Sequence, residues 1–405
     1  MIKKSLDYKN FIKPLFLNKS RLKSLDSKLH EILKLLPKLI KSKNETLNVL
    51  DKNFKFNFDF KDIKKFKKFN SLVIIGMGGS ILGTEAIYQF LNHKIKKEIF
   101  FLDDLNEIKI SDLKKKIIFK KTLFLIISKS GNTIETLSNS LFLNLIKKKS
   151  KNIIIISEKK NNTLFNFCKK MKLFFVEHKN FIGGRYSVLS EVGILPSYFM
   201  GLNIKKLRSE TENYKKNKEK FFLRRSALHM ACALKEKKFK NIIFLNYVPQ
   251  LEKFLYWSQQ LIAESLGKKN LGFLPVISNA PKDHHSLLQL YLDGPKDKIF
   301  TIFSFKGYKN QKVKNKNFKN SLNFLNNKTL SKIKEAQKNA LIKSFKKNNI
   351  PFREFKIQSI SEKTLSELFS FYILETFLIG KLANIDPFNQ PAVEQVKNYT
   401  KQLLK

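Results

Sequence analysis

Cysteine is nearly absent from this sequence of 405 residues. Cys168 and Cys232 are its only cysteines, which is too few for a disulfide framework or for a metal site built from thiolates. No apolar run approaches the roughly 20 residues of a membrane-spanning helix. Residues 1–16 also lack the continuous apolar core of a secretory signal. These absences predict a cytoplasmic protein that has no membrane partner.

Arginine is scarce as well, although the chain is strongly basic. Six arginines accompany 73 lysines, and the formal net charge is +46. A surface that reads nucleic acid usually favours the bidentate guanidinium of arginine. The joint abundance of Lys, Asn, Ile and Phe indicates instead a coding bias toward A and T. We therefore predict no nucleic-acid partner, while the excess charge attracts anionic substrates at low salt.

The chain is long enough for two domains, and 42% of its residues are hydrophobic. Short apolar segments alternate with helical ones in both halves, which predicts an α/β fold with mainly parallel sheets. The expected organisation is an N-terminal helical arm at 1–64, α/β domains at 65–220 and 221–385, and a C-terminal helical segment at 386–405. Strands are expected within 71–80, 98–104, 123–127, 152–158, 172–178, 241–247, 272–278, 300–305 and 352–358.

One of these strands runs into a loop that is rich in hydroxyl groups. The apolar residues 123–127 are followed by Ser128, Lys129, Ser130 and Thr133 at the start of a predicted helix. The first amide groups of a helix have no intrahelical partner and carry the positive end of its dipole. This arrangement is typical of a phosphate site, although an ordinary loop with a helix N-cap has the same appearance.

A second strand ends in Gly-Met-Gly-Gly-Ser at 76–80, where the backbone can approach a ligand closely. The pattern is not G-x-G-x-x-G and no ribose-binding acid follows the next strand, so we exclude a dinucleotide site.

Three further motifs are ambiguous when each is taken singly. Gln260 and Glu264 are four residues apart and project from one helical face, where a carboxylate can act as a base but commonly only faces solvent. Arg185 follows two glycines, which suits either an anion-stabilising cation or a surface turn. Asp283, His284 and His285 supply too few convergent ligands for a metal, and we predict none.

Together, six segments resemble the glucose-6-phosphate isomerase family in its short bacterial-type form. They run in consistent order from about residue 70 to the C-terminus: VIIGMGGSILG, SKSGNTIET, GGRYSVLSEVG, WSQQLIAESLGK, DHHSLLQLYLDGP and FNQPAVEQVK. The resemblance implies two sugar-isomerase (SIS) domains, each with a mainly parallel sheet flanked by helices. It also implies a homodimer whose subunits complete each other's active sites.

The resemblance further implies an aldose-ketose isomerase of glycolysis and gluconeogenesis. Glucose 6-phosphate and fructose 6-phosphate interconvert through a cis-enediol(ate), and no metal or organic cofactor is implied. The matching catalytic positions are Glu264 as the base, Arg185 as the enediolate-stabilising cation, His285 from the neighbouring subunit for ring opening, and Lys397 as its assistant. The matching substrate-binding positions are Gly79, Ser80, Ser128, Lys129, Ser130, Thr133, Gly184, Gln260 and Gln390.

The chain departs from the family pattern at three places. His284 stands where Gln is common, which leaves the register between His284 and His285 open, although the following Ser-x-x-Gln-Leu favours His285. Ser130 replaces a common Thr and keeps the hydroxyl. The chain ends soon after Lys397, so we expect the extended C-terminal arm of longer forms to be absent or reduced and dimerisation to rest more on the domains.

Three alternatives stay open. A non-catalytic sugar-phosphate sensor would need the 128–133 loop but none of the four catalytic positions, all of which are present. A basic nucleic-acid-binding protein would need clustered arginines or interleaved aromatic residues, which we do not find in the sequence. A dual phosphoglucose/phosphomannose isomerase would differ only in the face of the enediol that receives the proton.

Overall fold

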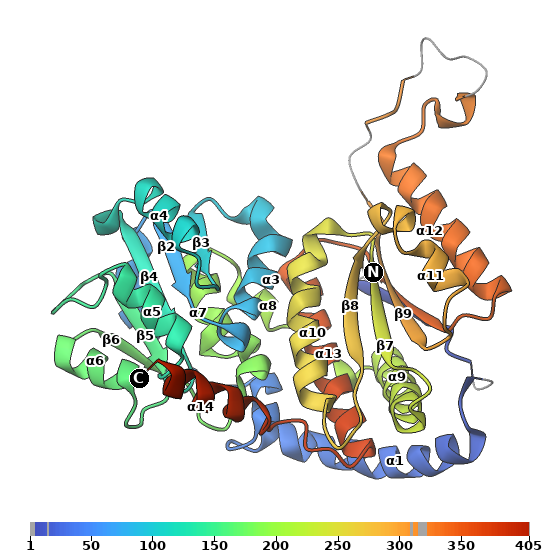
Figure 1. Cartoon of the computed structure of the whole chain (residues 1–405), viewed down its shortest axis with the longest axis horizontal. Helices are drawn as coiled ribbons and strands as arrows, with labels where there is room; N and C mark the ends of the chain where they lie inside the picture. Colours follow the sequence, from blue (N-terminus) through green and yellow to red (C-terminus); the bar gives the residue numbers. More distant parts are fainter. Residues whose placement is uncertain (1–4, 14–15, 308–310, 315–321, 405) are drawn as a thin grey trace.

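The computed structural model describes residues 5–13, 16–307, 311–314 and 322–404. Its described part contains two five-stranded sheets, which lie side by side along the longest axis with helices between them (Figure 1). Both sheets are mainly parallel and are flanked by helices, which confirms the predicted α/β fold class. Each of the nine predicted strands overlaps a strand of the structure.

The first sheet is parallel throughout and has the order β3-β2-β4-β5-β6. Its central strands are apolar on both faces and completely buried, as parallel strands covered by helices must be. The strands are β2 (Ser71–Ile75), β3 (Glu98–Leu102), β4 (Thr122–Ile127), β5 (Ile153–Ser157) and β6 (Phe174–Glu177).

The second sheet has the order β1-β10-β9-β7-β8 and is parallel except at one edge. That edge strand, β1, pairs antiparallel with β10 and belongs to the segment for which we expected a helical arm. The helical expectation is therefore wrong for this stretch, because a strand partner almost 350 residues away decides its conformation. The strands are β1 (Leu6–Asn10), β7 (Asn241–Asn246), β8 (Leu274–Asn279), β9 (Lys298–Phe305) and β10 (Phe352–Ile357).

Helices cover both sheets and fill the space between them. α3 and α13 both pack on α10 at the centre of the molecule (Figure 1). α13 is buried on nearly all sides, which fits its position between the two sheets. The helices are α1 (Lys19–Lys41), α2 (Phe60–Ile63), α3 (Leu82–Leu91), α4 (Glu107–Lys116), α5 (Ile134–Phe142), α6 (Thr163–Met171), α7 (Glu191–Phe199), α8 (Ile204–Leu207), α9 (Asn217–Glu236), α10 (Glu252–Leu266), α11 (Leu288–Leu292), α12 (Leu330–Lys347), α13 (Glu362–Leu382) and α14 (Val393–Leu403).

The register of the first sheet brings its two polar loops together. Ile75 at the end of β2 pairs with Ile126, one residue before the end of β4. The loops that follow these neighbouring parallel strands therefore leave the same edge side by side. Ligands of open α/β sheets bind at this carboxyl edge.

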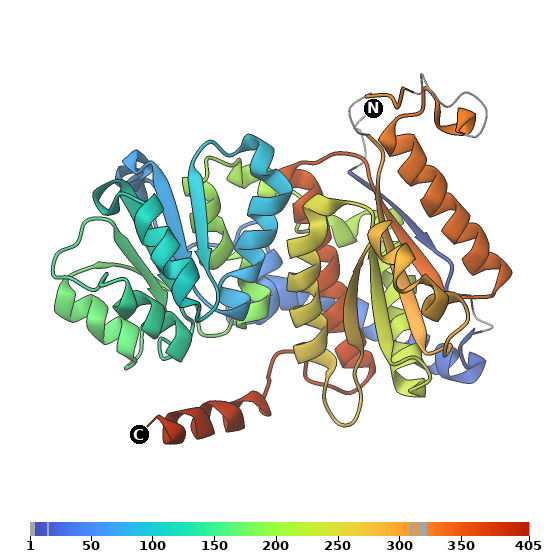
Figure 2. The same ribbon diagram turned by 45° about the horizontal axis from the view of Figure 1, so that its top comes forward.

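The C-terminal helix α14 stands apart from the rest of the molecule (Figure 2). None of its residues is buried, and its apolar side chains Val396 and Leu403 are 67% and 88% exposed. No helix in the described part of the chain is long and apolar enough to span a membrane.

Candidate active site

The loop after β4 presents hydroxyl groups at the start of α5. Ser128 Oγ and Thr133 Oγ1 lie 2.8 Å apart, and Gly131 turns the chain with a φ of +68°. A Cβ atom at Gly131 would lie 1.8 Å from Asn162 Oδ1, so the turn requires glycine. Thr133 occupies the N-cap position without a capping side-chain hydrogen bond. The first amide groups of α5 thus keep their capacity to bind an anion.

The other two polar residues of this loop already have partners. Ser130 Oγ accepts a hydrogen bond from the Asn132 amide at 3.3 Å. Lys129 Nζ donates to the Asn180 carbonyl at 2.8 Å and lies 3.6 Å from Glu158 Oε1. Burial lowers the pKa of Lys129, and the Glu158 carboxylate opposes that shift. A phosphate on the loop would therefore compete with Glu158 for the ammonium group.

The glycine-rich turn after β2, Gly78–Ser80, touches two other parts of the site. Gly78 has a φ of +52°, and a Cβ there would lie 2.7 Å from Gln260 Nε2. A Cβ at Gly79 would lie 2.2 Å from the carbonyl carbon of Gly184, and Ser80 is buried. The turn thus connects the 128–133 loop of the first sheet with the residues around Arg185 and α10.

Arg185 is the centre of the site. It follows Gly184 in a short 3-10 helix (Gly184–Leu189) and is only 2% exposed. A guanidinium has five N–H donors, and each of them has an acceptor here. Nε donates to Ser265 Oγ (2.8 Å), Nη1 to Glu264 Oε2 (3.2 Å) and Gln390 Oε1 (2.8 Å), and Nη2 to the carbonyls of Pro387 (2.7 Å) and Asn389 (3.0 Å).

Gln260 and Glu264 lie one turn apart on the same face of α10. Gln260 Nε2 donates to Glu264 Oε1 at 2.9 Å, while Arg185 donates to Oε2. The Glu264 side chain is 32% exposed and that of Arg185 only 1%. The carboxylate therefore lies between a buried cation and the solvent. Among the described residues, Gln260 Oε1 is a buried acceptor without a partner, which suits a substrate hydroxyl.

The segment that follows α13 closes over Arg185. Its carbonyls and Gln390 supply three of the five acceptors of Arg185. Lys268 Nζ, one turn beyond Glu264, donates to the Asp386 carbonyl at 2.6 Å. Burial, followed by the charge of Arg185, lowers the pKa of Lys268 to about 8. The structure thus brings Gln390 to Arg185 and Glu264, although more than a hundred residues separate them in sequence.

His284 and His285 differ in their exposure to solvent. They belong to a 3-10 helix (Lys282–His285) that follows β8. His284 is partly buried, and its Nε2 lies 2.8 Å from Tyr247 Oη. Burial and the neighbouring His285 lower the pKa of His284. His285 is exposed, and in the described part of the chain it forms no hydrogen bond to Arg185 or Glu264.

Lys397 is also exposed. It lies on α14, and its Nζ forms an ion pair of 2.6 Å with Glu394 on the same helix. Eleven of the thirteen predicted site residues therefore lie together: those of the two loops and of α10, with Gly184, Arg185 and Gln390. The other two, His285 and Lys397, lie on the surface of the single chain.

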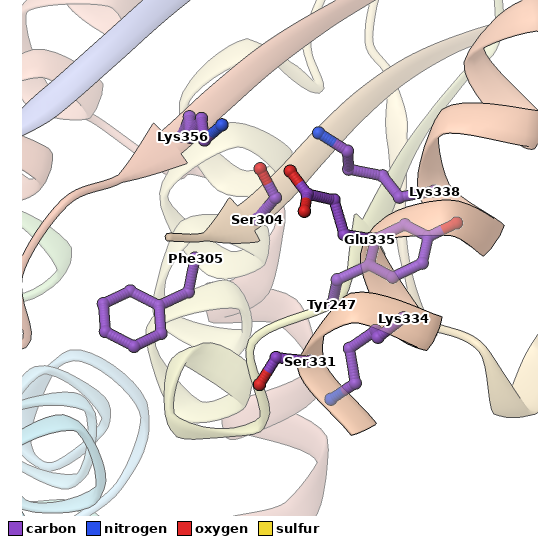
Figure 3. Close-up of a pocket in the computed structure, with 8 residues that line it drawn as sticks. All are labelled: Tyr247, Ser304, Phe305, Ser331, Lys334, Glu335, Lys338 and Lys356. Carbon is purple, nitrogen blue, oxygen red and sulfur yellow. The ribbon is translucent and has the colours of Figure 1, made fainter. Parts of the chain in front are cut away.

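A different cavity lies at the carboxyl edge of the second sheet (Figure 3). Its volume is about 20 Å³, which is enough for one or two water molecules but not for a hexose phosphate. The Lys338 ammonium at this cavity is paired with Glu354 at 2.6 Å. The cavity is lined by Tyr247, Ser304, Phe305, Ser331, Lys334, Glu335, Lys338 and Lys356.

Four residues that touch Arg185 or its neighbours are not among those predicted from sequence: Ser265, Tyr186, Pro387 and Lys268. Ser265 and Tyr186 directly follow predicted site residues, and Lys268 lies four residues after Glu264. Their proximity to Glu264 and Arg185 in sequence was the available signal. The hydrogen bonds that join them connect distant parts of the chain and leave no local pattern.

Comparison with known proteins agrees with this geometry. A family model described as phosphoglucose isomerase matches residues 51–405. The probable glucose-6-phosphate isomerase of Methanococcus maripaludis is 34% identical over 390 residues, which covers 93% of this chain and 87% of that protein. The glucose-6-phosphate isomerase of Campylobacter jejuni is 32% identical over 378 residues, covering 89% and 90% respectively.

Two solved structures share the fold. A hypothetical protein from Thermus thermophilus has a TM-score of 0.83 at 24% identity, with 98% of this chain and 99% of that chain covered. A glucose-6-phosphate isomerase from Chlamydia trachomatis has a TM-score of 0.74 at 18% identity, with 99% and 88% covered. Because the family model matches most of the sequence and relatives exceed 30% identity over most of its length, the chain belongs to the phosphoglucose isomerase family.

Proposed function

We propose that this chain interconverts glucose 6-phosphate and fructose 6-phosphate, with Glu264 as the base that moves the proton between C2 and C1. The observation that carries the proposal is the contact between the partly exposed Glu264 carboxylate and the buried guanidinium of Arg185. This pair is connected to the phosphate loop through the turn at Gly78 and Gly79. The reaction belongs to glycolysis and gluconeogenesis.

Binding begins at the phosphate loop. The hydroxyls of Ser128, Ser130 and Thr133 and the free amides at the start of α5 hold the phosphate. Lys129 exchanges its contact with Glu158 for one with the phosphate. Gly79 packs directly against the backbone of Gly184, where no side chain fits, so the turn stays beside Arg185. We assign Gly79 and Ser80 to the wall of the substrate pocket.

The proton transfer takes place at Glu264. The carboxylate removes the C2 proton of the open-chain aldose and returns it to C1 of the ketose, by way of a cis-enediolate. Gln260 and Arg185 orient the carboxylate through its two oxygens. Arg185 also stabilises the negative charge of the enediolate, and a fixed cation in a buried site stabilises such charge by several kcal/mol. Gln390, which accepts from the same Nη1, holds the substrate beside it.

Ring opening requires groups that the single chain does not place at this site. We assign it to His285 from a second copy of the chain, assisted by Lys397. Two observations support this assignment: His285 is exposed, whereas His284 is partly buried and bonded to Tyr247. We therefore favour His285 over His284. The functional unit is then a homodimer, since each site lacks a histidine without its partner.

A coupled assay with fructose 6-phosphate, in the presence of EDTA, tests the proposal on the wild-type chain and on Glu264→Gln. The wild type is expected to form glucose 6-phosphate. Glu264→Gln should lose roughly 10²- to 10⁴-fold in kcat, because general-base catalysis contributes about that much, while calorimetry still detects binding of the sugar phosphate. Wild-type turnover by Glu264→Gln would overturn the assignment of the base.

The same assay addresses the alternative functions. A sugar-phosphate sensor would bind without turnover, but it would have no use for the bonded set of Arg185, Glu264 and Gln390. Mannose 6-phosphate as a second substrate distinguishes a dual isomerase, which would consume or form it, from the dedicated enzyme that we propose.

A further inference from the structure

Behind Arg185 lies a closed circuit of hydrogen bonds. Arg185 Nε donates to Ser265 Oγ (2.8 Å), Ser265 Oγ lies 2.9 Å from Tyr186 Oη, and Tyr186 Oη donates to the Pro387 carbonyl (3.1 Å). Arg185 Nη2 donates to the same carbonyl (2.7 Å) and closes the circuit. Ser265 and Tyr186 are fully buried, so water does not compete for these bonds.

The chemistry of the groups fixes the direction of every bond in this circuit. The carbonyl of Pro387 only accepts, so the proton of Tyr186 must point to it. The guanidinium only donates, so Ser265 Oγ accepts from Arg185. The hydroxyl proton of Ser265 is then the one left to bridge Ser265 and Tyr186. Burial raises the pKa of Tyr186 to about 12, which keeps its proton in place.

The circuit determines where the remaining nitrogen of the guanidinium points. Because the group is planar and rigid, holding Nε and Nη2 also fixes Nη1, which faces Glu264 and Gln390. The circuit also ties the backbone at Pro387 to α10 through Ser265, and Gln390 lies three residues further along the chain. One set of bonds therefore aligns the cation, the carboxylate and the amide.

We propose that Ser265 and Tyr186 are positioning residues of the reaction. They do not touch the substrate; they act through Arg185, by aiming Nη1, and through Pro387, by placing Gln390. This inference rests on the proposed role of Arg185 in stabilising the enediolate. An opened circuit leaves the guanidinium in place but lets it rotate, so the loss is expected in the transition state rather than in substrate binding.

Kinetics of Ser265→Ala, Tyr186→Phe and the double variant test the proposal. Each single variant is expected to lose about tenfold in kcat, with KM changed by less than about twofold. Ser265→Ala removes a buried bond to the Arg185 guanidinium, and Tyr186→Phe removes the bonds to two of the acceptors of Arg185, Ser265 and the Pro387 carbonyl. Because one break opens the whole circuit, the kcat of the double variant should be no more than about twofold below that of the less active single variant.

Ser258→Ala is the matched control. Ser258 is buried on the same helix, and its hydroxyl donates to the Phe254 carbonyl within that helix. Ser258→Ala should keep the kcat of the wild type, although its melting temperature should change about as much as that of Ser265→Ala. Losses that multiply to about a hundredfold in the double variant, or an equal kcat loss in Ser258→Ala, would overturn the inference.

Arg185→Lys separates this inference from the proposed function. Full activity in Arg185→Lys would refute the role of Arg185 itself. If Arg185→Lys is impaired while Ser265→Ala and Tyr186→Phe each keep wild-type kinetics, only the positioning circuit is refuted. If the circuit acts through Arg185, adding Ser265→Ala to Arg185→Lys should change kcat by less than about twofold.

Discussion

At the scale of single residues, Arg185 is saturated with protein acceptors before any substrate binds. Among the side chains that accept from it, Glu264 carries a negative charge. In the mechanism that we propose, Glu264 becomes neutral when it takes the C2 proton, and the negative charge moves to the enediolate beside it. The buried cation keeps its position and exchanges one negative neighbour for another. Such a preorganised charge costs little reorganisation during the reaction.

Gly79 is predicted to be intolerant of any side chain. A Cβ atom would come within 2.2 Å of the Gly184 backbone, so Gly79→Ala must push the glycine-rich turn away from Arg185. We expect a loss of about 1–3 kcal/mol in the free energy of unfolding, as for an overpacked site, together with a large loss of kcat. Denaturant unfolding and the coupled assay measure both quantities.

Gly307→Ala is the control for this substitution. A Cβ there would meet Phe305 Cζ at an ordinary 3.6 Å, so stability and activity should remain close to those of the wild type. Wild-type behaviour of Gly79→Ala would show that the two backbones are not tightly apposed.

The sequence indicates some residue pairs of the site and conceals others. Gln260 and Glu264 are recognisable as neighbours because four residues make one helical turn. The contact of Arg185 with Glu264 and Gln390 is different, since it depends on how α10 and the segment after α13 pack against the first sheet. No spacing rule expresses that packing. The resemblance to a family supplied the residues without their geometry.

At the scale of elements, β1 shows most clearly what local patterns miss. The strand has only five residues, Leu-Asp-Tyr-Lys-Asn, and only the first of them is buried. It is stabilised by its pairing with β10 and by Tyr8, whose ring stacks on Phe222 at 4.6 Å. Tyr8 Oη donates to Glu367 Oε1 of α13 at 2.5 Å. These partners are more than 200 residues away, so residues 6–10 alone could not reveal them.

Glu367 is predicted to make stability depend on pH. Burial raises its pKa from the ordinary 4.5 to about 7. Between these values the folded chain keeps a proton that the unfolded chain has lost. Stability therefore falls as pH rises from about 4.5 to 7, by up to about 3 kcal/mol, and this contribution is then constant above pH 7.

Glu367→Gln should remove this dependence and raise the melting temperature at pH 8, since the amide oxygen can still accept from Tyr8. We would test this pH dependence with melting curves between pH 5 and 8, recorded for the wild type, Glu367→Gln and the exposed control Glu98→Gln. A wild-type slope that persists in Glu367→Gln would contradict the assignment to this carboxylate.

α14 is predicted to serve activity rather than stability of the fold. Since it buries no side chain in the single chain, a chain that ends at Ala392 should still form the dimer that we propose and melt within about 2 °C of the wild type. Its kcat should fall at least as far as that of full-length Lys397→Ala, because Lys397 is lost. Size-exclusion chromatography, melting curves and the coupled assay measure these effects. Wild-type turnover of the truncated chain would exclude Lys397 from the reaction.

At the scale of the whole molecule, the site is assembled from both halves of the chain. The phosphate loop and the glycine-rich turn belong to the first sheet, whereas Glu264 and Gln390 come from α10 and from the segment after α13. The alternation of strands and helices predicted the two sheets correctly. It could not predict that α3, α10 and α13 pack together between them, which brings the two sets of residues into one place.

The proposed mechanism also requires a second copy of the chain, which supplies His285. Glu264 lies inside the site that one chain forms, while His285 is exposed on the same chain. If His285 serves the partner's site, then Glu264→Gln and His285→Ala damage the same site of a mixed dimer. One of its two sites then combines an intact Glu264 with an intact His285, whereas the other has neither.

Subunit complementation is the most direct measurement of this claim. Glu264→Gln and His285→Ala, each nearly inactive alone, are unfolded together in equal amounts, refolded and assayed with fructose 6-phosphate. Random pairing makes half of the dimers mixed, so the predicted activity is about a quarter of that of the wild type refolded in the same way. Activity no greater than the average of the two variants assayed separately would contradict the shared site.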